Sequence, residues 1–77
     1  MNQEYATTDI TLAAVLKEKG CSLDRIATQG NKGIFYFAEV DHKLLADYDT
    51  GKILVEPVGL HAQIKNLTTA VKRQVRG

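Results

Sequence analysis

The last part of the chain concentrates positive charge and could contact an anionic partner. From residue 57 to residue 77 there is no Asp or Glu, whereas residues 1–56 carry nine acidic and six basic residues, a balance of −3. The acid-free stretch carries +4, and together the two parts give the net charge of +1. Lysines and arginines on an exposed helix face can neutralise phosphates, which is the sequence-independent part of nucleic-acid affinity. The basic residues of this stretch are Lys65, Lys72, Arg73 and Arg76.

The same stretch has the apolar spacing of an amphipathic helix. Pro57 suits the first turn of a helix, and apolar residues recur after it at intervals of three or four. At 100° per residue, Lys65, Lys72 and Arg76 fall within roughly 60° of one another, with Arg73 beside them and the apolar stripe elsewhere. The helix can therefore dock by one side and present a basic ridge on another. The apolar stripe is Leu60, Ile64, Leu67, Val71 and Val75.

Two other interpretations of this helix stay open. The cations can simply form a solvated face that is favoured near a helix C-terminus. The valines at the end of the stripe, Val71 and Val75, can extend past the domain's own core and serve self-association instead of packing within one chain.

A glycine-rich turn lies in the middle of the chain. Residues 23–28 and residues 34–37 are rich in β-branched or aromatic side chains, and residues 29–33 between them have turn chemistry, which predicts a β-hairpin. Gly30 to Gly33 also matches the GxxG loop with which KH domains clamp nucleic acid, and the strand after it faintly resembles an RRM strand. On that interpretation Lys32 and Tyr36 join the nucleic-acid contacts. The alternative is a plain hairpin, with Phe35 and Phe37 in the core.

Few residues suggest catalysis or metal binding. Cys21, His42 and His61 are scattered, without the close spacing of a zinc site. Nothing marks Cys21 as an activated nucleophile, and a small buried hydrophobe is the simpler interpretation. The acidic residues between 41 and 49 fit turns and caps. We therefore predict no enzyme activity, no cofactor and no metal.

The remaining elements predict a small α+β domain. Residues 1–6 are expected to be a loose lead-in, and residues 9–19 a helix that is capped by Thr8. Residues 41–48 favour a short helix over the tip of a second hairpin, and residues 53–55 favour a short strand. The predicted order is α-β-β-α-β-α, in which helices at the two ends of the chain cover a small antiparallel sheet made of the hairpin and one short strand.

Three segments together resemble a family of small uncharacterised proteins of bacteria and phages. They are the capped, alanine-rich run over residues 6–20, the strand Phe35-Tyr36-Phe37, and Val55-Glu56-Pro57 ahead of the last helix. The resemblance spans nearly the whole chain and implies one compact domain of prokaryotic or phage origin. It implies no activity and transfers no catalytic residue. Family members carry an aromatic residue near the start of the last helix, where this chain has His61.

The sequence as a whole predicts one domain over residues 1–77 that works by binding. A single cysteine excludes an internal disulfide and favours the cytoplasm, and no apolar stretch approaches the ~20 residues of a membrane span. The first hypothesis is a non-enzymatic interaction module whose partner is an unknown protein or a second copy. The second is weak, sequence-independent nucleic-acid binding through the basic helix. A small enzyme is a remote third.

Overall fold

Three strands form one antiparallel sheet in the order β1-β3-β2. The computed structural model describes residues 3–76, without the side chains of Gln3 and Arg76. Strand β1 covers Gln3–Thr7, β2 covers Leu23–Gln29 and β3 covers Lys32–Val40. In the central strand β3, Phe35 and Phe37 are fully buried on one face, because successive side chains of a strand alternate between faces.

The predicted hairpin is confirmed, with a loop of two residues. Gln29 pairs with Lys32 across Gly30 and Asn31. Gly30 has a φ of 63°, whereas no residue other than glycine has a positive φ among those described. A left-handed residue at the first position of a two-residue loop is typical of a type II′ turn, whose twist matches that of the flanking strands. This turn sets the register of the whole hairpin.

The N-terminal segment is a strand, so the predicted loose lead-in over residues 1–6 is wrong for its described part. Strand β1 pairs antiparallel with β3, with Tyr5 opposite Phe37 and Thr7 opposite Phe35. Exposure alternates along the strand, and Tyr5 packs against the core. Five residues with a single aromatic carry little strand signal. Pairing with β3 and burial of Tyr5 therefore stabilise a segment that its composition does not predict.

Helix α1 covers Ile10–Glu18 and provides the centre of the core. Its cap is Asp9, not the predicted Thr8: the Asp9 carboxylate accepts from the backbone amides of Thr11 (3.0 Å) and Leu12 (3.2 Å). An ionised carboxylate at this position satisfies two amides and also favours the positive end of the helix dipole. Residues 12–16 are all buried, so the helix is enclosed on most sides.

Helix α2 covers His42–Asp49, which confirms the predicted short helix and excludes a second hairpin there. Asp41 caps it by accepting from the amide of Lys43 at 2.9 Å. The hydroxyl of Tyr48 donates to the carboxylate of Asp9 over 3.2 Å. This bond connects α2 to the cap of α1, although the two residues are far apart in the sequence.

Helix α3 covers Pro57–Arg76, and the strand predicted before it is absent. Residues 52–56 have no regular structure, and the side chain of Leu54 in that segment is 83% exposed. The predicted strand is wrong because β1 occupies the place beside β3 that a third strand needs. The side chain of Glu56 accepts from the amides of Val58 and Gly59 and so begins the helix.

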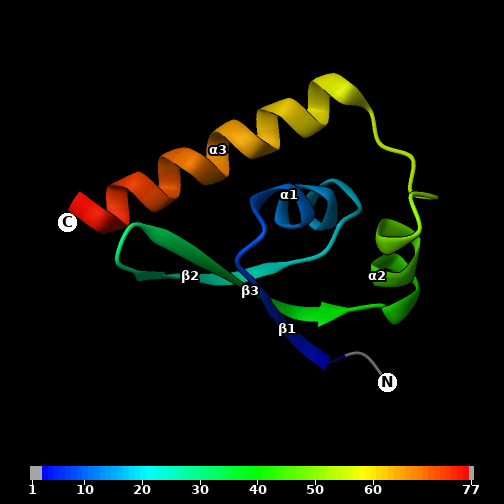
Figure 1. Cartoon of the computed structure of the whole chain (residues 1–77), viewed down its shortest axis with the longest axis horizontal. Coiled ribbons are helices and arrows are strands. Elements are labelled where there is room, and N and C mark those ends of the chain that lie inside the picture. The colour runs from blue at the N-terminus through cyan, green and yellow to red at the C-terminus, as the bar shows by residue number, and fades with distance from the viewer. Residues whose placement is uncertain (1–2, 77) are drawn as a thin grey trace.

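Helices α1 and α3 lie on the same face of the sheet (Figure 1). Helix α3 contacts α1 and β2, while α1 contacts β1 and β3. Leu67 is the buried residue of α3, and Leu60, Ile64 and Val71 pack partly buried against the core. The opposite face of the sheet carries Ile34 and Tyr36 and has no helix over it (Figure 1).

The fold class is confirmed as α+β, with three strands and three helices among the described residues. The predicted place of one strand is corrected: the observed order is β-α-β-β-α-α, because the third strand precedes α1 instead of following α2.

One close contact fixes α3 on the hairpin. A Cβ at Gly33 would collide with the Val71 side chain, so only glycine leaves room for the valine.

We predict that Gly33→Ala lowers the free energy of unfolding by about 1–3 kcal/mol, because the added methyl overpacks against Val71. Because Ala is more favourable than Gly within a strand, any loss of stability in this variant is due to the collision with Val71. Urea unfolding measures it. Adding Val71→Ala should restore space, and the double variant should lose at least about 0.5 kcal/mol less than the sum of the single variants. Strict additivity would contradict this contact.

Candidate interaction surfaces

The C-terminal end of α3 and the tip of the hairpin form one end of the molecule. An open hollow between them is lined by Asn31 of the turn and by Val71, Lys72 and Val75 of α3. Val75 is 43% exposed, while Val71 is only partly buried. Apolar side chains are therefore accessible at a place where two segments far apart in the sequence meet. We call this surface the basic end; its described residues are Asn31, Lys32, Val71, Lys72, Arg73 and Val75.

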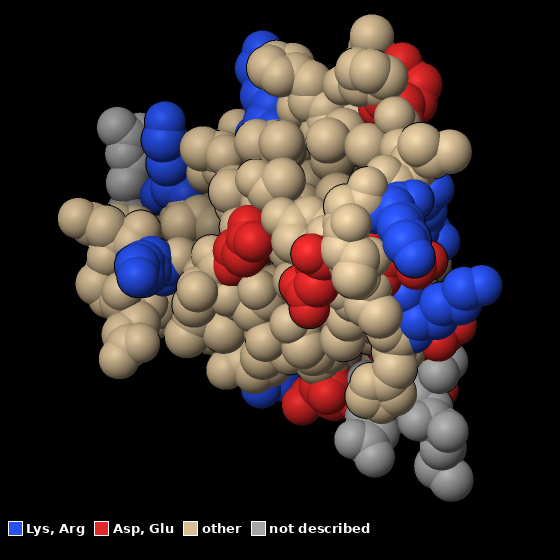
Figure 2. Space-filling model, turned by 45° about the vertical axis from the view of Figure 1, so that its right-hand side comes forward, with Lys and Arg blue, Asp and Glu red and all other residues tan. Residues whose placement is uncertain are grey.

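Both segments that build the basic end lack acidic residues. Residues 26–38 contain no Asp or Glu, and neither do residues 57–77. Lys32, Lys72 and Arg73 are exposed, and the ion pairs among the described residues all involve Arg25 instead. In Figure 2 Lys and Arg lie on both the left and the right of the molecule, and the acidic side chains lie toward the middle and right. The basic end therefore carries positive charge that nearby carboxylates do not neutralise.

The structure brings together only part of the predicted nucleic-acid surface. Lys72 lines the hollow with Val71 and Val75. Arg73 is exposed on α3, and Lys32 lies at the hairpin tip on the strand face that carries Ile34 and Tyr36. Lys65 is exposed on the same helix, roughly 10 Å before Lys72 at the rise of an α-helix. Arg76 ends α3, but its side chain lies outside the described residues.

Tyr36 lies on a different surface, the uncovered face of the sheet. Its ring packs against Arg25, whose guanidinium carbon lies 3.9 Å from the ring centroid. Arg25 also pairs with Glu4 at 3.8 Å and with Asp24 at 3.5 Å. Two carboxylates thus offset its charge, and the uncovered face has no net attraction for an anion at this point. Because α3 covers the opposite face, Tyr36 and the α3 cations cannot line one shared groove (Figure 1).

Sequence reasoning missed Arg25, although a signal for it was present. In the observed register Arg25 lies opposite Tyr36. A loop fixed at Gly30 and Asn31 would have predicted that pair, whereas a turn spread over residues 29–33 leaves the register open. The cation–π contact follows from the register alone, because directly opposite residues share a face.

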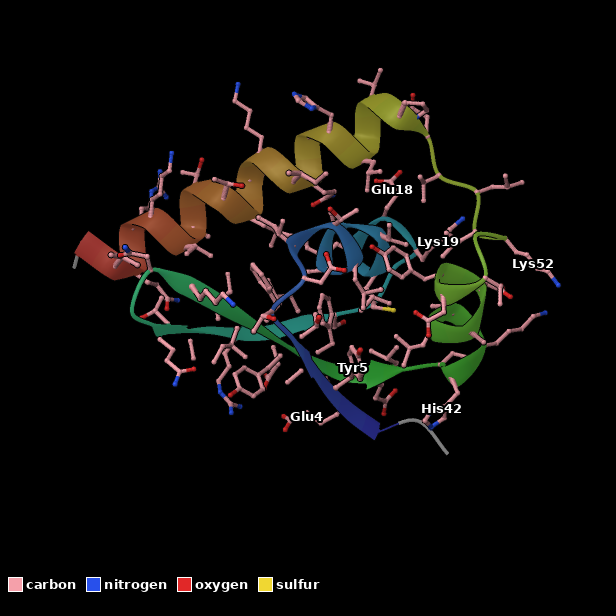
Figure 3. The ribbon with its side chains drawn as sticks, viewed as in Figure 1. Glu4, Tyr5, Glu18, Lys19, His42 and Lys52 are labelled. Atoms are coloured by element: carbon pink, nitrogen blue, oxygen red, sulfur yellow. The ribbon has the colours of Figure 1, made fainter. Side chains whose placement is uncertain are left out.

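The start of α3 carries a second exposed apolar pair. Leu54 is 83% exposed and Val58 is 76% exposed. Lys19, at the end of α1, donates from Nζ to the carbonyl of Leu54 and holds the segment in place. Figure 3 shows Glu18 and Lys19 directed toward the start of α3 and the segment before it. Isolated exposed apolar residues are common on soluble proteins, so this pair alone identifies no partner.

Cys21 is partly buried and packs against the core. Burial raises the pKa of its thiol, and the negative charge of Asp41 raises it further. A catalytic cysteine needs the opposite effect, a stabilised thiolate. Among the described residues, no group of three or more His, Cys, Asp or Glu side chains could hold a metal ion. Nor is any described helix long and apolar enough to cross a membrane.

Comparison with models of known protein families, with curated proteins and with solved structures finds no match for this chain. The resemblance to small bacterial and phage proteins therefore stays a prediction.

We predict that Cys21 reacts slowly with iodoacetamide in the folded protein. The raised pKa leaves less thiolate at a given pH, so the midpoint of the rate–pH profile should lie above that of the urea-unfolded chain. Asp41→Asn keeps a good cap for α2 but removes the charge, and should lower the midpoint. A folded midpoint at or below the unfolded one would contradict this environment.

Proposed function

We propose that this chain is a non-enzymatic interaction module that binds an acidic segment of another protein at the basic end. The observation that supports this most is the pairing of accessible apolar side chains with cations that form no ion pair with any described residue. Burial of the valines provides affinity, and the cations select the charge of the partner.

Basic residues lie in and beside the hollow. Lys72 lines it, Arg73 follows on α3, and Lys32 stands next to Asn31 in the turn. Like charges without counterions attract anionic partners and increase the rate of encounter. An acidic segment would supply the carboxylates that both segments of the basic end lack.

Val71 and Val75 provide the apolar part of the hollow. Full burial of a valine side chain is worth roughly 1.5 kcal/mol or more relative to an exposed one. Val75 is 43% exposed and therefore has much of this stabilisation still to gain. A partner with one apolar side chain between acidic residues would fill the hollow and contact the cations at once.

A second copy fits this end less well than an acidic partner. Symmetric contact through Val71 and Val75 would bring Lys72 of both copies close together, because Lys72 lines the same hollow. Juxtaposed like charges cost several kcal/mol at an interface. Self-association at the valines therefore works against the charge that distinguishes this surface.

Nucleic-acid binding through the same cations is the second candidate, favoured because Lys72 and Arg73 form no ion pair with any described residue. Three described cations would give a weak affinity with a modest salt dependence. The uncovered sheet face adds little to it, because Arg25 already covers Tyr36 and is paired with acids. The apolar hollow has no role in phosphate contact, so the protein partner explains more of the surface.

The test uses a fluorescent peptide of about twelve residues that alternates Glu and Leu, and a single-stranded DNA of similar charge. We predict that Lys72→Gln with Arg73→Gln weakens peptide binding about tenfold, which corresponds to about 1.4 kcal/mol. Val75→Ser should weaken it as well, because it removes the apolar anchor. Fluorescence anisotropy measures the dissociation constants.

The matched control is Lys43→Gln with Lys52→Gln, two exposed lysines of α2 and the loop after it, where Figure 3 places Lys52 far from the end of α3. These changes remove the same net charge and should leave peptide binding nearly unchanged. An equal loss in the control would mean that only overall charge matters. If the protein binds the DNA more tightly than the peptide, and Val75→Ser leaves the DNA affinity unchanged, the second candidate is favoured and the proposal is overturned.

A further inference from the structure

Strand β2 has a free edge that no other described strand covers. The sheet order β1-β3-β2 leaves β2 unpaired along its outer side over Leu23–Gln29. Natural proteins protect such edges with charges, proline or bulges. Here Asp24 and Arg25 occupy the first half, together with an irregularity in the register, whereas residues 26–29 are uncharged and contain no proline. The second half of the edge therefore carries no charge or proline that would oppose pairing.

The hairpin register shows which backbone groups face outward. In a hairpin with a two-residue loop, the residues that flank the loop form a hydrogen-bonded pair, and the pairs then alternate. Gln29 and Lys32 flank the loop, so Gln29 and Ala27 direct their backbone groups toward β3. Ile26 and Thr28 consequently direct their amide and carbonyl groups toward the free edge.

We propose that β2 pairs antiparallel with β2 of a second copy, about a two-fold axis at Ala27. In this register Ile26 of each copy lies opposite Thr28 of the other, so all of their outward backbone groups find partners. The two Ala27 residues meet at the axis as a non-hydrogen-bonded pair, where Cα atoms approach to about 4.5 Å and small side chains fit best. The product is a continuous six-stranded sheet.

The charges of β2 favour this register over its neighbours. An axis at Ala27 places Arg25 opposite Gln29 and Asp24 opposite Gly30, beside the hairpin tip that carries Lys32. An axis at Arg25 would oppose two arginines directly. An axis at Ile26 would place them diagonally on one face, roughly 7–8 Å apart. Of these three registers, only the one with the axis at Ala27 avoids like charges, and it brings Asp24 near a basic tip.

This inference goes beyond the proposed function and does not rest on it. The two basic ends lie on opposite sides of the axis, because each hairpin tip is about three residues beyond Ala27, or roughly 10 Å at the rise of a strand. An acidic partner could bind each copy while the β2 edges are paired. The dimer would therefore present two basic ends at a fixed separation.

The first test is a cross-link in the Cys21→Ser background. Ala27→Cys should form an intermolecular disulfide within minutes of adding a mild oxidant, seen as a dimer on non-reducing gels. Ala6→Cys is the matched control, because Ala6 lies on the same sheet face, opposite Tyr36, but on the other edge strand. Equal cross-linking of the two variants, or none at Ala27→Cys, would overturn the proposed axis.

The second test measures mass in the full chain by sedimentation equilibrium. The wild-type chain and Ala6→Lys should be dimeric, whereas Ala27→Lys places two like charges at the axis and should be monomeric. Circular dichroism and the midpoint of thermal unfolding at low concentration should show that Ala27→Lys still folds. A monomeric wild-type chain at millimolar concentration, or a dimeric Ala27→Lys, would contradict the proposal.

Discussion

The packing of α3 onto the hairpin at Gly33 and Val71 is the contact on which the other surfaces depend. A Cβ at Gly33 would collide with Val71, so the helix sits as close to the strand as a backbone allows. This contact brings residues 26–38 beside the end of residues 57–76, and both segments lack acidic side chains. The basic end is thus a product of tertiary packing. Neither segment alone carries both the apolar hollow and the cations around it.

The elements with strong local signals were predictable from the sequence. These elements have local causes, namely alternation, capping and helical spacing. They are the aromatic strand around Phe35 and Phe37, the helix that follows Asp9, the short helix capped by Asp41, and the apolar stripe that ends at Val75. The predictions were wrong where tertiary contacts, and not local sequence, determine the secondary structure. Strand β1 has little intrinsic signal and is stabilised by pairing with β3, while residues 53–55 have β-branched side chains but no free place beside β3.

The candidate site was predictable only in part. Charge counting found Lys72 and Arg73, and helical spacing found Val71 and Val75 as an accessible end of the stripe. Neither charge counting nor helical spacing could predict that these α3 residues lie near Asn31 and Lys32, because the position of the turn relative to α3 depends on the fold. The same limit applies to Tyr36, because its position opposite Arg25 follows only from the exact register of the hairpin. One basic ridge plus an aromatic was expected, but the structure divides these residues between two opposite faces of the sheet (Figure 1).

The close approach of Val71 to Gly33 can be measured directly in solution. Nuclear Overhauser spectroscopy on the methyl-labelled protein reports proton pairs within about 5 Å, the range of ordinary side-chain packing. The account predicts strong cross-peaks from both Val71 methyl groups to the Gly33 α-protons, because the valine fills the space above this glycine. Their absence in a folded sample would mean that α3 does not dock on the hairpin tip, and the basic end would not exist as one surface.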